Sequence, residues 1–249
     1  MSQSPPIDVL IIGSGPASLT AAPTLARQLH TAIVFDSGDY RNLEASYMHM
    51  VLTWDHKSPK QFRTSARREI ENNYNTIRFE DVELKTVKQT EAGFEVADGN
   101  GKTWVGKKLI LATGSASDFP DIPDSSSKAS DRFAVDNRKI SRLVKGDQGA
   151  EVILKFEDGS AKTESFITHN PNTHTIGPFA EQLGLKLIQT GDIDASAPSY
   201  TTSVRGVFAA GDSITPYKVV DGALSSGCNA AVAAVAQLRA EDLGHQPFS

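Results

Sequence analysis

A glycine turn between an apolar run and a helix constrains this chain more than any other feature. Residues 7–12 are apolar and rich in β-branched side chains, which is typical of a buried parallel strand. The turn over residues 13–18 reads GSGPAS, and a helix is predicted from 16 to about 29. A second strand, 32–35, ends at Asp36. The pattern predicts a βαβ unit whose glycines let backbone amides approach a pyrophosphate at a helix N-terminus.

The turn departs from the G-x-G-x-x-G pattern in one place, since Ser18 stands where the third glycine is usual. Asp36 follows about twenty residues later, where a carboxylate can accept the hydroxyls of a ribose. On these residues alone, the site could serve FAD or NAD(P).

Alternating residues farther along the chain predict an antiparallel meander, followed by a buried strand that ends at Thr113-Gly114. A loop or linker rich in Pro, Ser and Asp spans 118–136, and a hairpin is expected after it. A surface helix near 179–183, a strand closed by Gly211-Asp212 and an alanine-rich helix over 220–238 follow. The meander strands are expected at 77–79, 82–84, 94–96 and 103–105, and the hairpin strands at 152–156 and 165–167.

Charge and cysteine content exclude several classes of function. The 249 residues carry a net charge of −5 and no long basic run, so nucleic acid is not expected as a partner. The first six residues lack basic side chains, and the apolar run after them is too short to span a membrane. We therefore expect a cytoplasmic protein without membrane association. Cys228 is the only cysteine, which excludes an intrachain disulfide and a paired-thiol redox centre.

Three glycine-containing strand ends carry a resemblance to a known family. The N-terminal turn, Thr113-Gly114 after the meander and Gly211-Asp212 before the alanine-rich helix occur in this order in the chain. As a set they resemble the thioredoxin reductase-like flavoproteins, and most of all the fungal branch that includes the dithiol oxidases of gliotoxin-type biosynthesis. The segments that carry the resemblance are 34–42, 109–114, 177–185 and 206–212.

The resemblance implies a fold and a domain organisation. It implies an α/β, FAD/NAD(P)-binding Rossmann-like domain of three layers (ββα), assembled from N- and C-terminal segments with a remnant antiparallel insert. The FAD domain is expected at 1–120 and 172–249. A linker and a short β-hairpin remnant of the nucleotide domain are expected at 121–171. FAD is expected to be bound non-covalently, because no histidine or cysteine lies in a recognisable flavin-attachment motif. By the same resemblance, the protein is expected to be a homodimer.

The resemblance also places FAD on particular residues. Gly13, Gly15 and Ala17 would face the pyrophosphate, Asp36 the adenosine ribose and Asp212 the ribitol hydroxyls. The amides near residues 219 and 220, at a helix N-terminus, would lie opposite flavin N1 and the C2 oxygen. The full set of expected cofactor residues is Gly13, Gly15, Pro16, Ala17, Asp36, Ser37, Arg41, Asn42, Val82, Thr113, Gly114, Gly211, Asp212, Val219 and Val220.

The chain also departs from the family pattern. Members normally carry a nucleotide domain with a second glycine turn, and a Cys-x-x-Cys pair beside the flavin. Here the only later Gly-x-Gly, at 99–101, falls between meander strands and opens no helix. About fifty-five residues separate Pro120 from Ile176, too few for a βαβαβ domain when one βαβ unit needs about thirty. Neither a dedicated NADPH site nor a cysteine relay is therefore expected.

Three residues are candidates for chemistry at the flavin. His49 and His56 lie in the segment that, by resemblance, passes near the isoalloxazine, and a histidine can act as general base near neutral pH. Lys218 could place a positive charge near N1, or it could be a solvated lysine. His169 and His174 match no metal motif, and no metal is expected. Cys228 lies among small helical residues and is expected to be a packing thiol.

These observations favour an FAD-dependent oxidase or dehydrogenase that acts directly on a small organic molecule of the secondary-metabolite type. Oxygen is the expected acceptor, because it needs no preformed binding domain. Two alternatives stay open. One is a non-redox flavoenzyme, such as a cyclase, isomerase or dehydratase, in which FAD shapes the pocket. The other is a non-catalytic or engineered minimal FAD-binding domain.

Overall fold

The computed structural model describes residues 7–118, 136–167 and 172–245, which divide into two compact units. The first unit takes its residues from Met1–Ala116 and Thr173–Ser249, and the second from Ser117–Asn172. The first unit is therefore assembled from N- and C-terminal segments. The sequence predicted these divisions after residues 120 and 171.

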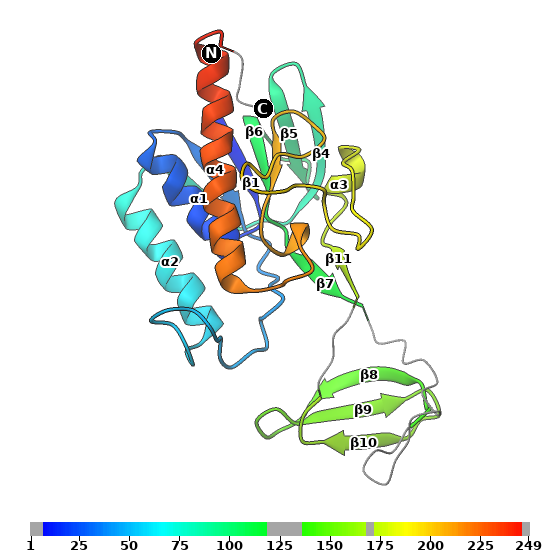
Figure 1. The fold of residues 1–249 in the computed structure, drawn as a ribbon. Coiled ribbons are helices and arrows are strands. Elements are labelled where there is room, and N and C mark those ends of the chain that lie inside the picture. Colours follow the sequence, from blue (N-terminus) through cyan, green and yellow to red (C-terminus); the bar gives the residue numbers. More distant parts are fainter. Residues whose placement is uncertain (1–6, 119–135, 168–171, 246–249) are drawn as a thin grey trace. The chain divides into compact units, whose positions relative to one another are not determined.

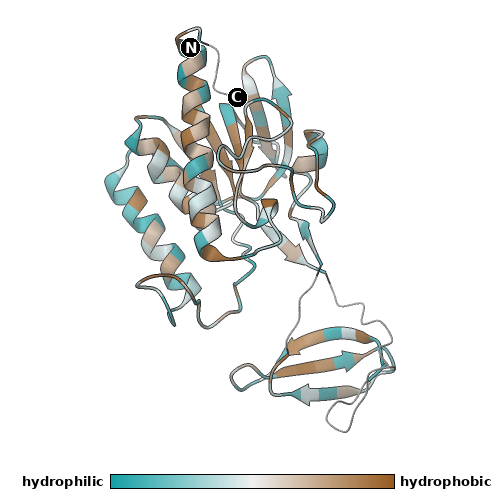
Figure 2. Cartoon of the chain, viewed as in Figure 1, coloured by the Kyte–Doolittle hydropathy of each residue, from teal (hydrophilic) through white to brown (hydrophobic). Residues whose placement is uncertain are grey.

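A parallel sheet forms the centre of the first unit (Figure 1). Its strands lie in the order β3 (Ile77–Glu80), β2 (Ala32–Phe35), β1 (Ile7–Ile12) and β6 (Thr103–Leu111), and β12 (Val207–Ala209) pairs with β6. Consecutive residues of β1 face opposite sides of the sheet, and both sides are buried. This explains why β1 is apolar from Val9 to Ile12 and why β2 and β12 are apolar throughout, and the centre of the sheet is largely brown in Figure 2.

Two further strands, β4 (Leu84–Thr90) and β5 (Gly93–Asp98), are antiparallel and join the first half of β6. Gly106 pairs with both β5 and β1, and a Cβ there would lie 2.6 Å from Cγ of Leu10. The predicted meander is thus partly wrong. Residues 77–79 belong to the parallel sheet, because β3 pairs with β2, and residues 82–83 lie outside the strands.

Three helices cover one face of the parallel sheet: α1 (Pro16–Arg27), α2 (Pro59–Asn73) and α4 (Val220–Asp242) (Figure 1). Their apolar side chains pack with those of Val9 and Ile11, whereas Leu10 and Ile12 pack with the meander on the other face. The predicted three-layer α/β arrangement is therefore confirmed. Helix α2 was not predicted, although Ser58 before Pro59 is a start signal, and Ser58 Oγ accepts a hydrogen bond from the Gln61 amide.

Short elements complete the first unit on the side where the parallel strands end. Strand β7 (Ser115–Ser117) pairs with β11 (Thr173–Thr175), and α3 (Phe179–Gln182) follows. The turn after β12 is a short 3₁₀ helix, Gly211–Ile214, which leads into α4. No helix in the part of the chain that the structure describes is long and apolar enough to cross a membrane.

The second unit contains a three-stranded antiparallel sheet in the order β10 (Ala161–Glu164), β9 (Val152–Phe156) and β8 (Ile140–Lys145). The predicted second hairpin strand at 165–167 is wrong, because the turn is tighter: Ser160 donates its amide to Asp158 Oδ1, and Gly159 has a φ of 84°. Strand β8 was not predicted. Most of the predicted linker and His169 lie outside the described residues.

Candidate functional site

A cavity of about 750 Å³ opens in the first unit where β1, β2, β6 and β12 end. The carboxyl ends of parallel strands meet at one edge of a sheet, which is the usual place for a ligand site in such folds. Its wall contains every cofactor residue expected from the sequence except Asp36, together with His49 and Lys218. His56 and Cys228 are not part of this wall.

The glycine turn has the geometry that a phosphate cradle needs. Gly13 has a φ of 108°, and a Cβ there would lie 2.3 Å from the Ala112 carbonyl oxygen, so only glycine fits. A Cβ on Gly15 or Gly114, by contrast, would meet nothing within 4 Å. Gly15 is the N-cap of α1 and has no side chain that could accept a bond from the helix amides. The Gly13 amide donates to the Phe35 carbonyl (3.0 Å), so the turn offers an anion the open space at Gly15 and the uncapped start of α1.

The second half of the cavity wall is held against this turn by small residues. A Cβ on Gly211 would lie 3.1 Å from Cβ of Ala17, and one on Gly227 of α4 would lie 2.0 Å from the Ala17 carbonyl oxygen. Ser226 Oγ accepts a hydrogen bond from the Gly211 amide (3.0 Å). Helix α4 therefore packs directly against the backbone at the start of α1 and at the strand end at Gly211.

Helix α4 presents a second uncapped N-terminus to the cavity. Val219 is the N-cap, its side chain cannot accept a hydrogen bond, and Val219 and Val220 both line the wall. Nearby, Ser115 Oγ is fully buried and makes no hydrogen bond to any residue that the structure describes. An unpaired buried hydroxyl costs free energy, so a polar ligand group in the cavity is a fitting partner for it.

Asp36 lies behind the wall and is engaged by its own loop. Its carboxylate accepts hydrogen bonds from the Tyr40 hydroxyl (2.5 Å) and the Gly38 amide (2.9 Å), and Arg67 Nη1 lies 3.6 Å away. Burial and the bond to Asp36 raise the pKa of Tyr40 to about 12. Tyr40 therefore stays protonated, and it is itself part of the cavity wall.

Arg63 is a cation in the wall that the sequence did not reveal. It extends from α2, is only 8% exposed, and places its guanidinium carbon 3.9 Å from the centre of the Tyr40 ring. Its Nη1 donates to Asn42 Oδ1 (2.6 Å), and burial lowers its pKa. The remaining guanidinium donors suit a phosphate or hydroxyl oxygen. Helix α2 has few apolar positions, so the sequence did not predict the helix and gave no indication that Arg63 would reach the cavity.

Lys218 and Asp212 are linked through an ionic network beside the 3₁₀ turn. Lys218 Nζ donates to Asp192 Oδ1 (2.7 Å) and to the Asp212 carbonyl oxygen (2.6 Å), whereas Arg41 Nη1 donates to the Asp212 carboxylate (3.2 Å). The side chains of Lys218 and Asp192 are 7% and 2% exposed. The alternative of a solvated lysine is therefore wrong, and the ammonium instead fixes the backbone that carries Asp212.

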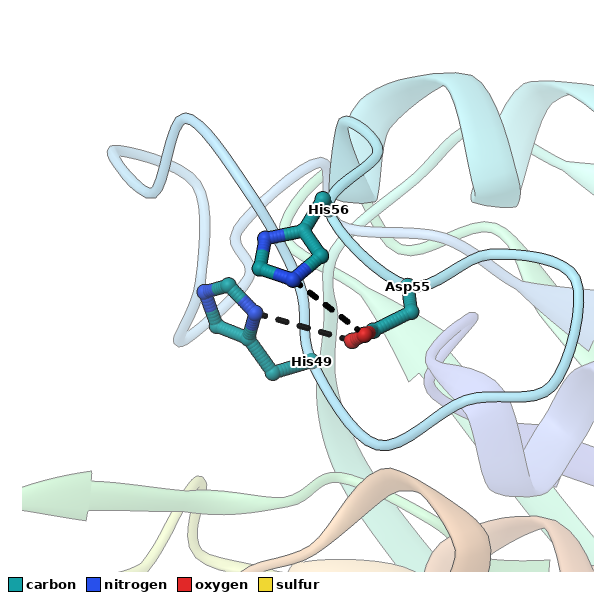
Figure 3. A group of neighbouring side chains, drawn as sticks. All are labelled: His49, Asp55 and His56. Carbon is teal, nitrogen blue, oxygen red and sulfur yellow. Dashed lines mark ion pairs between the residues drawn. The ribbon is translucent and has the colours of Figure 1, made fainter.

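The two histidines lie on one exposed loop with Asp55 between them (Figure 3). His49, 57% exposed, reaches the cavity wall, whereas His56, 76% exposed, does not. Cys228 lies on α4 and accepts a long hydrogen bond from Thr24 Oγ1 (3.5 Å), which is the expected packing position between α4 and α1.

Comparisons with known proteins agree with this geometry. A family model described as pyridine nucleotide-disulphide oxidoreductase matches residues 7–154. Thioredoxin reductase tcpT of Claviceps purpurea (strain 20.1) is 34% identical, over 97% of this chain and 97% of its own length. Thioredoxin reductase sirT of Leptosphaeria maculans is 32% identical, over 90% and 91%. The solved structure of a putative thioredoxin reductase TrxB from Bacillus anthracis shares the fold, with a TM-score of 0.78 and 21% identity over 95% of this chain and 99% of that chain.

The match to tcpT runs over 311 residues, which is 62 more than the 249 of this chain. That relative thus matches this chain almost end to end while carrying residues that have no counterpart here. The predicted resemblance to thioredoxin reductase-like flavoproteins is confirmed, and the family implies a flavin cofactor, FAD. The chain belongs to the pyridine nucleotide-disulphide oxidoreductase family and is an FAD-dependent oxidoreductase.

Proposed function

We propose that this protein oxidises a small organic molecule directly at a non-covalently bound FAD, with oxygen as the electron acceptor. One observation carries the proposal: a cavity of about 750 Å³ lies at the glycine turn, while the chain has only one such turn that opens a helix and only one cysteine, which lies outside the cavity wall. The proposed reaction therefore uses neither a second bound nucleotide nor a disulfide between two cysteines of the chain. The substrate loses two electrons and two protons, and oxygen gains them to give hydrogen peroxide.

The residues of the wall fit FAD at both of its ends. The open turn at Gly15 and the start of α1 would hold the pyrophosphate, with Arg63 as a cation nearby and Asp36 behind the wall for the adenosine ribose. Asp212 would hold the ribitol hydroxyls, and Ser115 would gain a hydrogen-bond partner. When bound, FAD supplies the two-electron oxidation.

The start of α4 would contribute electrostatics to the reaction. The Val219 amide donates to the Tyr217 carbonyl (3.1 Å), but the Val220 amide at the start of the helix lacks a side-chain cap and carries partial positive charge, which stabilises negative charge that develops near it. Lys218 does not act on the substrate itself. Its hydrogen bond to the Asp212 carbonyl holds the 3₁₀ turn Gly211–Ile214, which carries the Asp212 side chain, in position.

His49 is the best placed of the candidate bases. It is part of the cavity wall and exposed, so its imidazole can accept a proton from an acidic O–H, S–H or C–H of the substrate and pass it to solvent. His56 lies outside the wall, and Lys218 is already paired with Asp192. We therefore propose His49 as the general base.

Spectroscopy of the purified full-length chain tests the proposal. We expect a yellow protein that NADPH does not bleach rapidly under anaerobic conditions, that an oxidisable small molecule does bleach, and that regains its colour with air while forming peroxide. Rapid stoichiometric bleaching by NADPH would contradict the proposal. Turnover that survives replacement of FAD by a redox-inactive analogue would favour the non-redox alternative instead.

A matched pair of variants tests the cofactor site itself. Asp212→Ala removes a carboxylate from the cavity wall, and we expect the FAD content after purification to fall well below that of the native chain. Asp221→Ala removes an exposed carboxylate from the first turn of α4, outside the wall, and should keep its FAD. Equal FAD content in the two variants would refute the assignment of Asp212.

A further inference from the structure

The loop from Met48 to Lys57 brings two imidazoles and one carboxylate together (Figure 3). His49 Nδ1 lies 3.6 Å from Asp55 Oδ1, and His56 Nε2 lies 3.3 Å from Asp55 Oδ2. One ligand atom from each residue lies within 4.8 Å of the other two. We propose that these three residues bind one divalent transition-metal ion at the margin of the cofactor cavity.

The backbone of the loop, rather than side-chain contact alone, sets this arrangement. The Met48 amide donates to the Lys57 carbonyl (2.8 Å) and the His56 amide to the Met48 carbonyl (2.9 Å), so the two ends of the loop run side by side. The Met50 amide donates to Asp55 Oδ1 (2.9 Å) and orients this carboxylate. His56 itself adopts a φ of 56°, a left-handed conformation that non-glycine residues seldom keep. The three side chains are therefore held on a closed loop.

The distances suit a shared ion better than direct hydrogen bonds. Separations of 3.3 and 3.6 Å are longer than the 2.7–3.2 Å of a good N–H···O bond. Around a tetrahedral Zn²⁺ with bonds of about 2.0–2.1 Å, neighbouring donor atoms lie about 3.3 Å apart. The two measured distances are close to this value, although they end on different oxygens of Asp55, Oδ1 for His49 and Oδ2 for His56. One ligand atom from each residue already lies within 4.8 Å of the other two, and rotation of these exposed side chains can bring one carboxylate oxygen and the two nitrogens to tetrahedral spacing.

The charge of Asp55 is also available to a cation. Among the described residues, no lysine or arginine forms an ion pair with Asp55. The neighbouring Lys57 turns away, since its Nζ donates to the Thr53 carbonyl (2.7 Å) and lies 5.3 Å from the centre of the Trp54 ring. Two imidazoles and one carboxylate favour Zn²⁺, Ni²⁺ or Cu²⁺ over Mg²⁺ and Ca²⁺, which prefer oxygen ligands alone.

Three protein ligands leave a coordination position for water or for a substrate atom. Because His49 also lines the cavity, that position would lie at the edge of the space where the substrate reacts. An O–H or S–H group bound there would lose its proton more readily, because the ion stabilises the resulting anion. This consequence rests on the proposed function and would replace His49 as the base, whereas metal binding itself does not depend on that function.

Calorimetric titration with Zn²⁺ tests the site in the untagged, full-length, FAD-loaded chain after treatment with a chelator. We expect one Zn²⁺ to bind per chain. His49→Ala and His56→Ala should each weaken binding at least about tenfold. Asp55→Asn should do the same, although its amide oxygen can still accept the Met50 hydrogen bond and keep the loop in place. His245→Ala, at an exposed position away from the loop, should bind Zn²⁺ like the native chain.

A spectroscopic readout and folding controls make the result decisive. Electron paramagnetic resonance of the Cu²⁺-loaded chain should show coupling to two imidazole nitrogens, and to one in His56→Ala. FAD content and melting temperature identify any variant that has lost its fold, in which case Asp55→Asn decides. Undiminished Zn²⁺ affinity in the folded variants would overturn the metal site. Saturable Zn²⁺ binding in a chain whose flavin no substrate reduces would support the metal site and refute the proposed function.

Discussion

Lys218 and Asp192 form a buried ion pair beside the cavity, and the Thr190 hydroxyl donates to the second oxygen of Asp192 (2.7 Å). Lys218→Met would leave the Asp192 carboxylate buried without its cation, which costs about 3–5 kcal/mol of stability. We expect a clearly lower urea midpoint for this variant. The double variant Lys218→Met, Asp192→Leu should recover most of the loss, because apolar replacement of a buried pair is often neutral.

An exposed lysine provides the control for this residue-scale prediction. Lys60→Met, on the exposed side of α2, should leave the urea midpoint almost unchanged. If the double variant were as unstable as Lys218→Met alone, the loss would come from the missing lysine stem or from the Asp212 contact. The coupling assigned here to the two charges would then be wrong.

Packing between elements depends on Gly227, where α4 crosses the first turn of α1. Gly227→Ala places a methyl group against the Ala17 carbonyl, a backbone atom that cannot rotate away. We expect α4 to be displaced from α1, with a loss of at least about 1–3 kcal/mol and weaker FAD binding. Gly222→Ala on the same helix meets only the Val219 side chain at 3.2 Å and should be tolerated, since alanine favours a helix.

Thermal unfolding with and without added FAD measures both effects. A normal melting temperature and a normal FAD affinity in Gly227→Ala would show that α1 and α4 can adjust to the methyl group. Close packing at Gly227 would then not be what holds the two helices in place at the cavity.

The elements that the sequence revealed are those whose signals are local. Strand β1, the turn at Gly13 and helix α1 follow one another without interruption, and each supports the next. Helix α2 was missed because only four of its fifteen residues are buried, so it has no continuous apolar stripe. Strand β3 was assigned to the meander because alternation in Ile77-Arg78-Phe79 does not tell which partner a strand pairs with.

The same reasoning separates the predicted from the unpredicted parts of the cavity. Glycines at strand ends are visible in a sequence, because their role depends on backbone conformation at that position. Arg63, Tyr40 and Ser115 became candidates only when distant elements brought them to one wall, so their neighbours along the chain carry no signal of it. The pairing of Lys218 with Asp192 likewise spans separate loops.

At the scale of the whole molecule, the carboxylate of Asp8 in the central strand β1 contributes to the stability of the fold in acid. Burial acts to raise its pKa, but hydrogen bonds from Lys107 Nζ (2.8 Å) and the Thr31 amide (3.0 Å) outweigh this and hold the pKa below 3.8. The stabilisation is therefore complete above about pH 3.8 and is lost as the pH falls through the lower folded pKa. We expect Asp8→Asn to have a flatter acid limb in a plot of melting temperature against pH.

Lys107→Met provides the complementary measurement, since it removes the strongest favourable contact of the same carboxylate. Its acid limb should also be flatter, and the double variant should resemble Asp8→Asn. An acid limb in Asp8→Asn that is as steep as in the native chain would assign the acid sensitivity to other carboxylates.

The strand pair β7 and β11 marks where the chain leaves the central fold and returns to it, and just beyond it the Asp118 amide donates to the Asn172 carbonyl (2.8 Å). The two ends of the intervening segment are thus adjacent, whatever its length. An insertion or deletion between them need not change the register of any strand in the main sheet. The junction can accept segments of very different size without disturbing the strands that carry the cavity, and it gives protein engineers a place to add a new module.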